Sequence, residues 1–164
     1  MKYVNETVRR QDRLLSEERA LQLIRDSEYG VLSMVDADGG AYGLPLNYVW
    51  DGEHSLYIHC APEGKKLRAL AHNQDASFCI VGHTNLLPSR FTTEYESVVM
   101  KCHAVTAIDD EEKRHALQLL IDKLAPEYKE AGIKAAEKSF HRVGIIRLDI
   151  IEFSGKCKAV PSAH

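Results

Sequence analysis

Residues 59–66, HCAPEGKK, bring an imidazole, a thiol, a glycine and two lysines together at the end of an apolar run. Lys65 and Lys66 open a predicted helix, although the macrodipole makes a cation at this end unfavourable by about 0.3–1 kcal/mol. A bound anion would offset that repulsion, since the first backbone N–H groups of a helix also point toward such a ligand. Gly64 would let the backbone approach it closely. The segment thus predicts an anion site, and a pair of solvated surface lysines is the simpler alternative.

His59 is the candidate for proton chemistry, because it ends a predicted strand next to the lysine segment. Neutral and charged imidazole are both accessible near pH 7, so this side chain could contact a ligand or donate a proton. A histidine that is simply hydrogen-bonded at the end of a strand explains its position equally well.

Five further side chains are weaker candidates for ligand contacts. The hydroxyls of Tyr95 and Ser97, at the start of a predicted strand, could hydrogen-bond a phosphate or a ring carbonyl. Arg142 and Arg147 are candidate phosphate partners, although most arginines lie on the surface. Trp50 could stack on a ligand, and a place in the core is the safer interpretation.

The sequence argues against several classes of protein. It has no Ser-His-Asp order and no nucleophile elbow, which disfavours the familiar hydrolases. None of its four cysteines forms a C-x-x-C pair, so no metal site is predicted. A net charge of −3 gives no basic field for nucleic acid, and no apolar run is long enough to span a membrane. Without a signal-peptide core at its N-terminus, the protein is expected in the cytoplasm.

The elements that must position these residues are mostly strands. Apolar runs between turn residues predict strands at Tyr29–Val35, Tyr42–Trp50, Leu56–Cys60, Ala76–Val81, Tyr95–Ile108 and Val143–Phe153. Helical spacing and capping residues predict helices at Ser16–Asp26, Lys65–Asn73 and Asp109–Leu124, and a weaker one at Ile133–Phe140. Residues 82–91 are expected to form a loop, and the tail after Gly155 is expected to fray. The chain therefore predicts a single domain, residues 1–164 with a core at about 16–156, built as an antiparallel barrel with peripheral helices.

The chain resembles the FMN-binding split-barrel superfamily of pyridoxamine-5'-phosphate oxidase in three successive segments: YGVLSMVDADGGAYGLPLNYVWDGEHSLYIHCAPEGKKLRAL, ASFCIVG and YESVVMKCHAV. The pattern is most similar to the nitroimidazole-reductase branch and covers roughly residues 8–156. This resemblance implies a mainly β fold, a six-stranded split β-barrel with peripheral helices. It also implies a homodimer with FMN at the subunit interface, each flavin being in contact with both chains.

The resemblance also assigns site residues. Lys65 and Lys66 match the basic residues that hold the FMN phosphate, and Lys66 is the stronger candidate. His59 and Cys60 match the strand-end positions that lie along the cofactor. The strand whose backbone faces the isoalloxazine ring is matched by Leu44, Pro45, Leu46 and Asn47. The segment contributed by the partner chain is matched by Ser97, with Tyr95 nearby, and a looser match on the last strand includes Arg147 and Phe153.

The function implied by the resemblance is two-electron reduction of a small acceptor, such as a nitroaromatic, by reduced FMN. A nicotinamide cofactor or another reductant would supply the electrons. In this branch a histidine at the position of His59 lies on the substrate side of the flavin, which makes His59 the catalytic candidate. The arginine-rich C-terminal segment of pyridoxamine-5'-phosphate oxidases has no counterpart in SGKCKAVPSAH, which argues against vitamin B6 oxidation.

Two other functions stay open. The protein could be a non-catalytic split barrel that stores or senses flavin or haem, and a haem would need an axial ligand such as His59 or His164. Alternatively, the barrel could serve only for association between proteins, in which case it would bind no cofactor.

Overall fold

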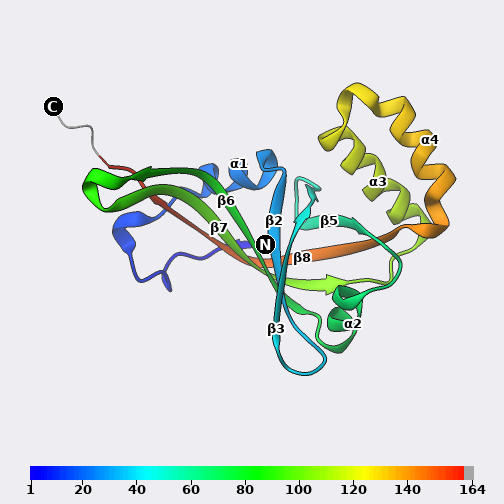
Figure 1. Ribbon diagram of the computed structural model, residues 1–164, viewed down its shortest axis with the longest axis horizontal. Coiled ribbons are helices and arrows are strands. Elements are labelled where there is room, and N and C mark those ends of the chain that lie inside the picture. The colour runs from blue at the N-terminus through cyan, green and yellow to red at the C-terminus, as the bar shows by residue number, and fades with distance from the viewer. Residues whose placement is uncertain (161–164) are drawn as a thin grey trace.

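The structure, a computed structural model, describes residues 1–160 and is mainly β. Eight strands form one sheet in the order β3-β2-β6-β7-β8-β5-β4, with β1 added beside β8 (Figure 1). Neighbouring strands are antiparallel except β1 and β8, which are parallel. The strands are β1 (Lys2–Tyr3), β2 (Tyr29–Val35), β3 (Ala41–Asn47), β4 (Val49–Trp50), β5 (Ser55–Cys60), β6 (Asp75–Leu87), β7 (Thr92–Val105) and β8 (Gly144–Lys158).

Within the described residues the hydrogen-bonded sheet does not close, and the six-strand prediction is not confirmed. The strand predicted at residues 42–50 is divided at Tyr48, because β3 pairs with β2 whereas β4 pairs with β5. These two strands are the ends of the sheet, so a single residue of the chain joins its ends. Tyr48 is fully buried at the junction, where its hydroxyl donates a 2.6 Å hydrogen bond to the Ile24 carbonyl.

The loop predicted at residues 82–91 is wrong, since most of this segment is strand. β6 continues to Leu87, and its pairing with β7 is interrupted by a register shift between Val81 and Thr84. Such a bulge bends a strand without ending it. The result is a long β6–β7 arm that extends to the left in Figure 1, away from α2 and α3.

Residues 156–158 do not fray as expected, because β8 continues to Lys158 beside β7, and residues 161–164 of the predicted tail lie outside the described residues. Gly155 itself is a point of close approach. A Cβ at this position would lie 2.8 Å from Leu15 Cβ and 3.2 Å from Ala20 Cβ, so the absent side chain lets the segment that carries α1 pack on β8.

The helices lie where the sequence predicts them. They are α1 (Glu17–Asp26), α2 (Lys65–His72), α3 (Asp110–Leu124) and α4 (Lys129–Ser139), and four 3₁₀ turns cover Gln11–Arg13, Pro88–Arg90, Pro126–Tyr128 and Phe140–Arg142. Ser16 caps α1 by accepting a hydrogen bond from the Arg19 backbone N–H, and Asp109 caps α3 through Glu112 N–H. α4 starts earlier than predicted, at Lys129. In residues 1–160 we find no helix with the length and apolar character needed to cross a membrane.

The main core lies on the inner face of the sheet, where alternate side chains of the strands are buried against α1 and α2. Phe78, Phe153 and Leu32 are among its largest fully buried members. Trp50 also belongs to this core, which confirms the prediction that its indole ring is a core side chain. A second cluster lies between α3 and the sheet and contains Val49, Tyr57, Ala116, Leu120 and Ile145.

The opposite face of the sheet carries apolar side chains that remain accessible. The strand register places Val31, Cys79 and Val99 side by side across β2, β6 and β7. Val99 is 47% exposed and Val81, on the same face of β6, is 56% exposed. We call this surface, Val31, Cys79, Val81 and Val99, the outer sheet face.

Candidate functional site

The lysine segment begins α2 directly after β5, as the sequence predicts. Gly64 precedes the helix with φ of 138°, a left-handed value that disfavours other residues, and nothing lies within 4 Å of the place where its Cβ would be. No side chain caps this helix end. The first backbone N–H groups of α2 are therefore not capped by a side chain, and an anion could accept hydrogen bonds from them.

The two lysines have different surroundings. Lys65 Nζ forms a 2.7 Å ion pair with Asp36 Oδ2 in the β2–β3 turn, and it lies 4.6 Å from the ring centre of Tyr42. Their hydrogen bond raises the pKa of Lys65 and lowers the pKa of Asp36. Lys66 is half-buried and makes no hydrogen bond or ion pair with any described residue. Lys66 is thus the cation left available for a ligand.

Cys60 lies beneath this helix end. Its side chain belongs to the main core, and Lys66 is the charge that acts on it. Burial raises the pKa of the Cys60 thiol, an effect that Lys66 partly opposes. The thiol therefore stays protonated at neutral pH, which fits a packing residue better than a nucleophile.

β3 provides a free strand edge next to α2. It pairs with β2 along its whole length and lies at the end of the sheet, so its other edge leaves backbone N–H and C=O groups unpaired. Leu44 and Leu46 pack against the core, whereas Pro45 and Asn47 are exposed. The Asn47 amide donates a 3.0 Å hydrogen bond to the Glu28 carbonyl. The contacts of Lys65 with Asp36 and Tyr42 place the turn end of β3 beside α2, and residues 44–47 continue the strand away from that turn.

His59 lies on the opposite side of the sheet from Cys60. It pairs with Ile145 of β8, and the alternation along β5 directs Ile58 and Cys60 into the main core and Tyr57 toward α3. The His59 side chain lines a cavity of about 220 Å³ whose other walls come from α3 and α4. The residue is therefore next to the lysine segment in the chain, but it faces the α3–α4 hairpin.

Tyr95 and Ser97 lie on the β6–β7 arm. They pair with Lys158 and Lys156 of β8, and Glu96 between them points the other way, toward α1, where it forms a 2.7 Å ion pair with Arg19. Figure 1 shows the arm and α2 on different sides of the molecule. Within a single chain, the hydroxyls of Tyr95 and Ser97 therefore do not lie next to Lys66.

Arg147 is engaged within the protein and is not a free phosphate partner. Its guanidinium donates to Glu112 at 2.7 Å and to Asp149 at 2.8 Å, and the two hydrogen bonds raise its pKa. Tyr57 donates to the same Glu112 oxygen at 3.0 Å. This network ties α3 to the sheet. Arg142 is exposed after α4.

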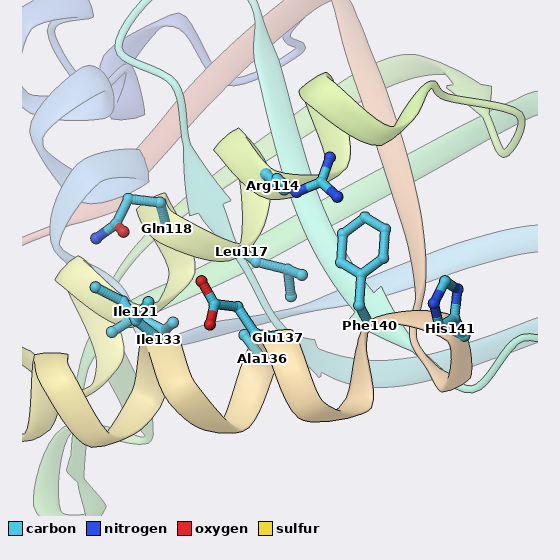
Figure 2. A pocket seen from close by; sticks show the side chains of 9 residues that line it. All are labelled: Arg114, Leu117, Gln118, Ile121, Ile133, Ala136, Glu137, Phe140 and His141. Carbon is cyan, nitrogen blue, oxygen red and sulfur yellow. The ribbon is translucent and has the colours of Figure 1, made fainter.

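The α3–α4 hairpin contains a second cavity, of about 450 Å³, that sequence reasoning did not indicate (Figure 2). Leu117 and Ile121 of α3 and Ala136 of α4 line both cavities. Arg114 and Glu137 line only the second one. The apolar spacing along α3 is visible in the sequence, but a pattern in one helix does not show which of its faces the sheet leaves uncovered.

Two other expectations concern metal and haem ligands. Across residues 1–160 no group of three or more His, Cys, Asp or Glu side chains could hold a metal ion. His164, named as a possible haem ligand, lies outside the described residues.

A family model described as pyridoxamine 5'-phosphate oxidase matches residues 16–157. No curated protein sequence matches the chain.

Several solved structures share the fold. A protein from Bacteroides thetaiotaomicron, assigned provisionally to 5-nitroimidazole antibiotic resistance, is 21% identical with a TM-score of 0.70, and the match covers 88% of this chain and 86% of that one. An FAD-binding protein from Mesorhizobium loti is also 21% identical, with a TM-score of 0.65 and coverages of 90% and 98%. A flavocytochrome from Azotobacter vinelandii is 20% identical, with a TM-score of 0.74 and coverages of 90% and 70%.

Proposed function

The chain belongs to the pyridoxamine 5'-phosphate oxidase family, and from this premise we propose that it is an FMN-binding flavoprotein that reduces a small acceptor such as a nitroaromatic. The observation that carries the proposal is the unpaired Lys66 beside the open, uncapped N-terminus of α2. A phosphate group there would meet both a cation and unpaired backbone N–H donors.

The residues around this phosphate position also suit the flavin ring. The free edge of β3, at residues 44–47, offers backbone groups to a planar heterocycle, and Lys65 holds the turn end of the same strand next to α2. Bound flavin would supply the two-electron redox chemistry, while the protein binds it and orients the acceptor. The electrons would come from a nicotinamide cofactor or another reductant.

The proposal includes a homodimer with a site made by both chains. The exposed apolar side chains of the outer sheet face support it, because a second copy would cover them. Ser97 pairs with Val81 and lies on this same face, so a partner chain docked there can present it to the flavin. The free state of all four cysteines fits a reducing compartment, and we place the protein in the cytoplasm.

A non-catalytic haem- or flavin-binding protein is the second candidate. The observation in its favour is that His59 is exposed beside an apolar cavity, where an imidazole could serve as an axial ligand. One solved structure of the same fold is named an FAD and haem binding protein from Mycobacterium smegmatis. A Soret band in the purified protein would favour this candidate over the reductase.

Titration with FMN and with riboflavin, followed by flavin fluorescence, tests the proposal. We expect Lys66→Ala to raise the Kd for FMN about tenfold or more, since a charge-assisted hydrogen bond is worth about 1.5–3 kcal/mol. Riboflavin has no phosphate, so its Kd should stay the same. Lys65→Ala is the matched control and should have a smaller effect, because the Lys65 charge is already paired with Asp36.

Two results would contradict the proposal at different levels. An FMN Kd that is equal in the wild type and in Lys66→Ala would remove the phosphate assignment. A wild-type protein that binds neither FMN nor riboflavin would remove the flavoprotein function itself.

A further inference from the structure

The cavity of about 450 Å³ in the α3–α4 hairpin lies apart from the proposed flavin site. Its volume is within the range of about 300–1,000 Å³ that is usual for small-molecule pockets. Leu117 and Ile121 of α3 and Ile133 of α4 give it apolar walls. Among the described residues that line it, none comes from α2 or β3, so a ligand in this cavity would not depend on bound flavin.

One end of the cavity orients a cation. The Arg114 guanidinium lies 4.5 Å from the ring centre of Phe140, which is 8% exposed, and His141 meets the same ring edge-on. A guanidinium stacked on an aromatic ring keeps the N–H groups at its edge available for a planar carboxylate. Within residues 1–160 Arg114 makes no ion pair, and its guanidinium donates a 3.3 Å hydrogen bond only to the Asp110 carbonyl.

A carboxylate lines the same cavity. Figure 2 shows Glu137 pointing from α4 toward α3. Glu137 forms no hydrogen bond or ion pair with any other described residue, Arg114 included. Gln118, on the facing helix, uses its amide nitrogen to donate a 2.9 Å hydrogen bond to Asp122, so its amide oxygen can accept one. The cavity therefore offers acceptors for a cationic group as well as a cation for an anionic group.

A ligand has to match both charges. A plain carboxylate would pair with Arg114 but would also face Glu137, and a plain amine would pair with Glu137 but would also face Arg114. A molecule that has both groups on an apolar body gains both partners. Each contact would be a charge-assisted hydrogen bond, which is roughly twice as strong as a neutral one.

We propose that the α3–α4 cavity binds a free amino acid with an apolar side chain. The carboxylate of the ligand accepts hydrogen bonds from Arg114, and its ammonium group donates to Glu137 and Gln118. The apolar side chain of the ligand lies against the leucine and isoleucine walls, where it is removed from water. This inference goes beyond the proposed function and does not rest on it.

Isothermal titration calorimetry of the purified protein with L-phenylalanine tests the assignment. Two analogues serve as further probes: hydrocinnamate lacks the ammonium group, and phenethylamine lacks the carboxylate. We expect the wild type to bind L-phenylalanine about tenfold more tightly than either analogue, because each analogue loses one charge-assisted contact.

Two variants identify which side chain meets which charge. Arg114→Gln and Glu137→Gln replace exposed residues, and each should weaken binding of L-phenylalanine about tenfold. Arg114→Gln should not weaken binding of phenethylamine, and Glu137→Gln should not weaken binding of hydrocinnamate. The matched controls are Arg142→Gln and Glu130→Gln, since these residues are exposed and do not line the cavity. Both controls should bind L-phenylalanine as the wild type does.

Two results would overturn the inference. One is a wild type that does not bind L-phenylalanine at millimolar concentrations, and the other is equal affinity for it in the two cavity variants and their controls. Titration of the same proteins with FMN separates this result from the proposed function. If L-phenylalanine binds and is lost in the cavity variants, but the wild type does not bind FMN, the cavity assignment holds and the flavoprotein function fails.

Discussion

His59 and Cys60 show how much one step along a strand changes the chemistry of a side chain. Cys60 points into the main core below Lys66, and burial raises the pKa of its thiol. His59 points to the other side, into the cavity next to α3. Because neighbouring residues of a strand face opposite ways, these two cannot act on the same ligand atom from the same side.

Replacing His59 by alanine should separate flavin binding from acceptor reduction. We expect His59→Ala to keep its affinity for FMN and to reduce the acceptor about a hundredfold more slowly, as is typical when a general acid is lost. Anaerobic stopped-flow measurement of flavin reoxidation in a single turnover gives this rate.

The matched control is His54→Ala, which removes an exposed histidine from the turn before β5. Equal reoxidation rates in His59→Ala and His54→Ala would exclude His59 from proton donation. A large loss of FMN affinity in His59→Ala would instead indicate that the imidazole holds the cofactor.

At the scale of elements, Lys123 joins α3 to the end of α1. Its Nζ donates a 2.6 Å hydrogen bond to the carbonyl of Ser27 and lies 4.0 Å from the ring centre of Tyr48. Tyr48 in turn donates to Ile24 of α1 at the junction of β3 and β4. A partly buried lysine therefore sits where two helices and the two ends of the sheet meet.

The titration of Lys123 should change how the free energy of unfolding depends on pH. Burial lowers the pKa of Lys123 to about 8, whereas the pKa of a lysine in an unfolded chain is about 10.4. Between these values the unfolded chain binds more protons, so the contribution of Lys123 to the free energy of unfolding rises with pH. Urea unfolding of the wild type and of Lys123→Met, from about pH 8 to about pH 10, measures it.

The quantity to follow is the difference in the free energy of unfolding between the wild type and Lys123→Met. Burial raises the pKa values of Cys60, Cys79 and Cys102, which makes the stability of both proteins fall as pH rises through the unfolded thiol value. That common effect cancels in the difference. If the free energy of unfolding of the wild type, minus that of Lys123→Met, does not increase with pH, the pKa of Lys123 is not lowered in the folded protein.

At the scale of the whole molecule, the candidate site is divided between two regions of the chain. α2 and the turn end of β3 lie together, while Tyr95 and Ser97 lie on the β6–β7 arm, on another side of the molecule (Figure 1). The arm also exposes Phe91 almost completely, at 97%. An exposed apolar tip and an exposed apolar sheet face are both features that a second copy of the chain would cover.

Mixed dimers distinguish a shared site from one made by a single chain. We expect Lys66→Ala and Ser97→Glu homodimers to bind FMN weakly. A dimer with one chain of each kind, isolated by two different tags, should keep one intact site and bind about half the wild-type amount of FMN, because one site would combine both wild-type surfaces. The bound flavin is measured by absorbance after gel filtration.

The opposite result has a clear meaning. If α2 and β7 of the same chain formed the site, each chain of the mixed dimer would carry a defect and the dimer would bind no more FMN than the homodimers. A monomeric wild type would exclude the shared site altogether.

Local patterns in the sequence determine most of the elements and much of the chemistry. The caps at Ser16 and Asp109, the apolar runs of the strands and the glycine–lysine start of α2 all depend on residues a few positions apart, so they can be recognised without a fold. The same information does not give the lengths of β6 and β8, because those strands are extended by hydrogen bonds to distant partners.

The tertiary structure alone decides which side chains remain available. Lys65 and Lys66 are the same residue type, yet Asp36, about 30 positions earlier, engages Lys65 and leaves Lys66 free. Arg147 is likewise engaged by Glu112, and His59 faces the helices because β5 pairs with β8 in one register. The sequence therefore determines what each residue can do, whereas long-range pairing determines which partners it meets, since the free energy of those contacts exists only when distant segments are folded together.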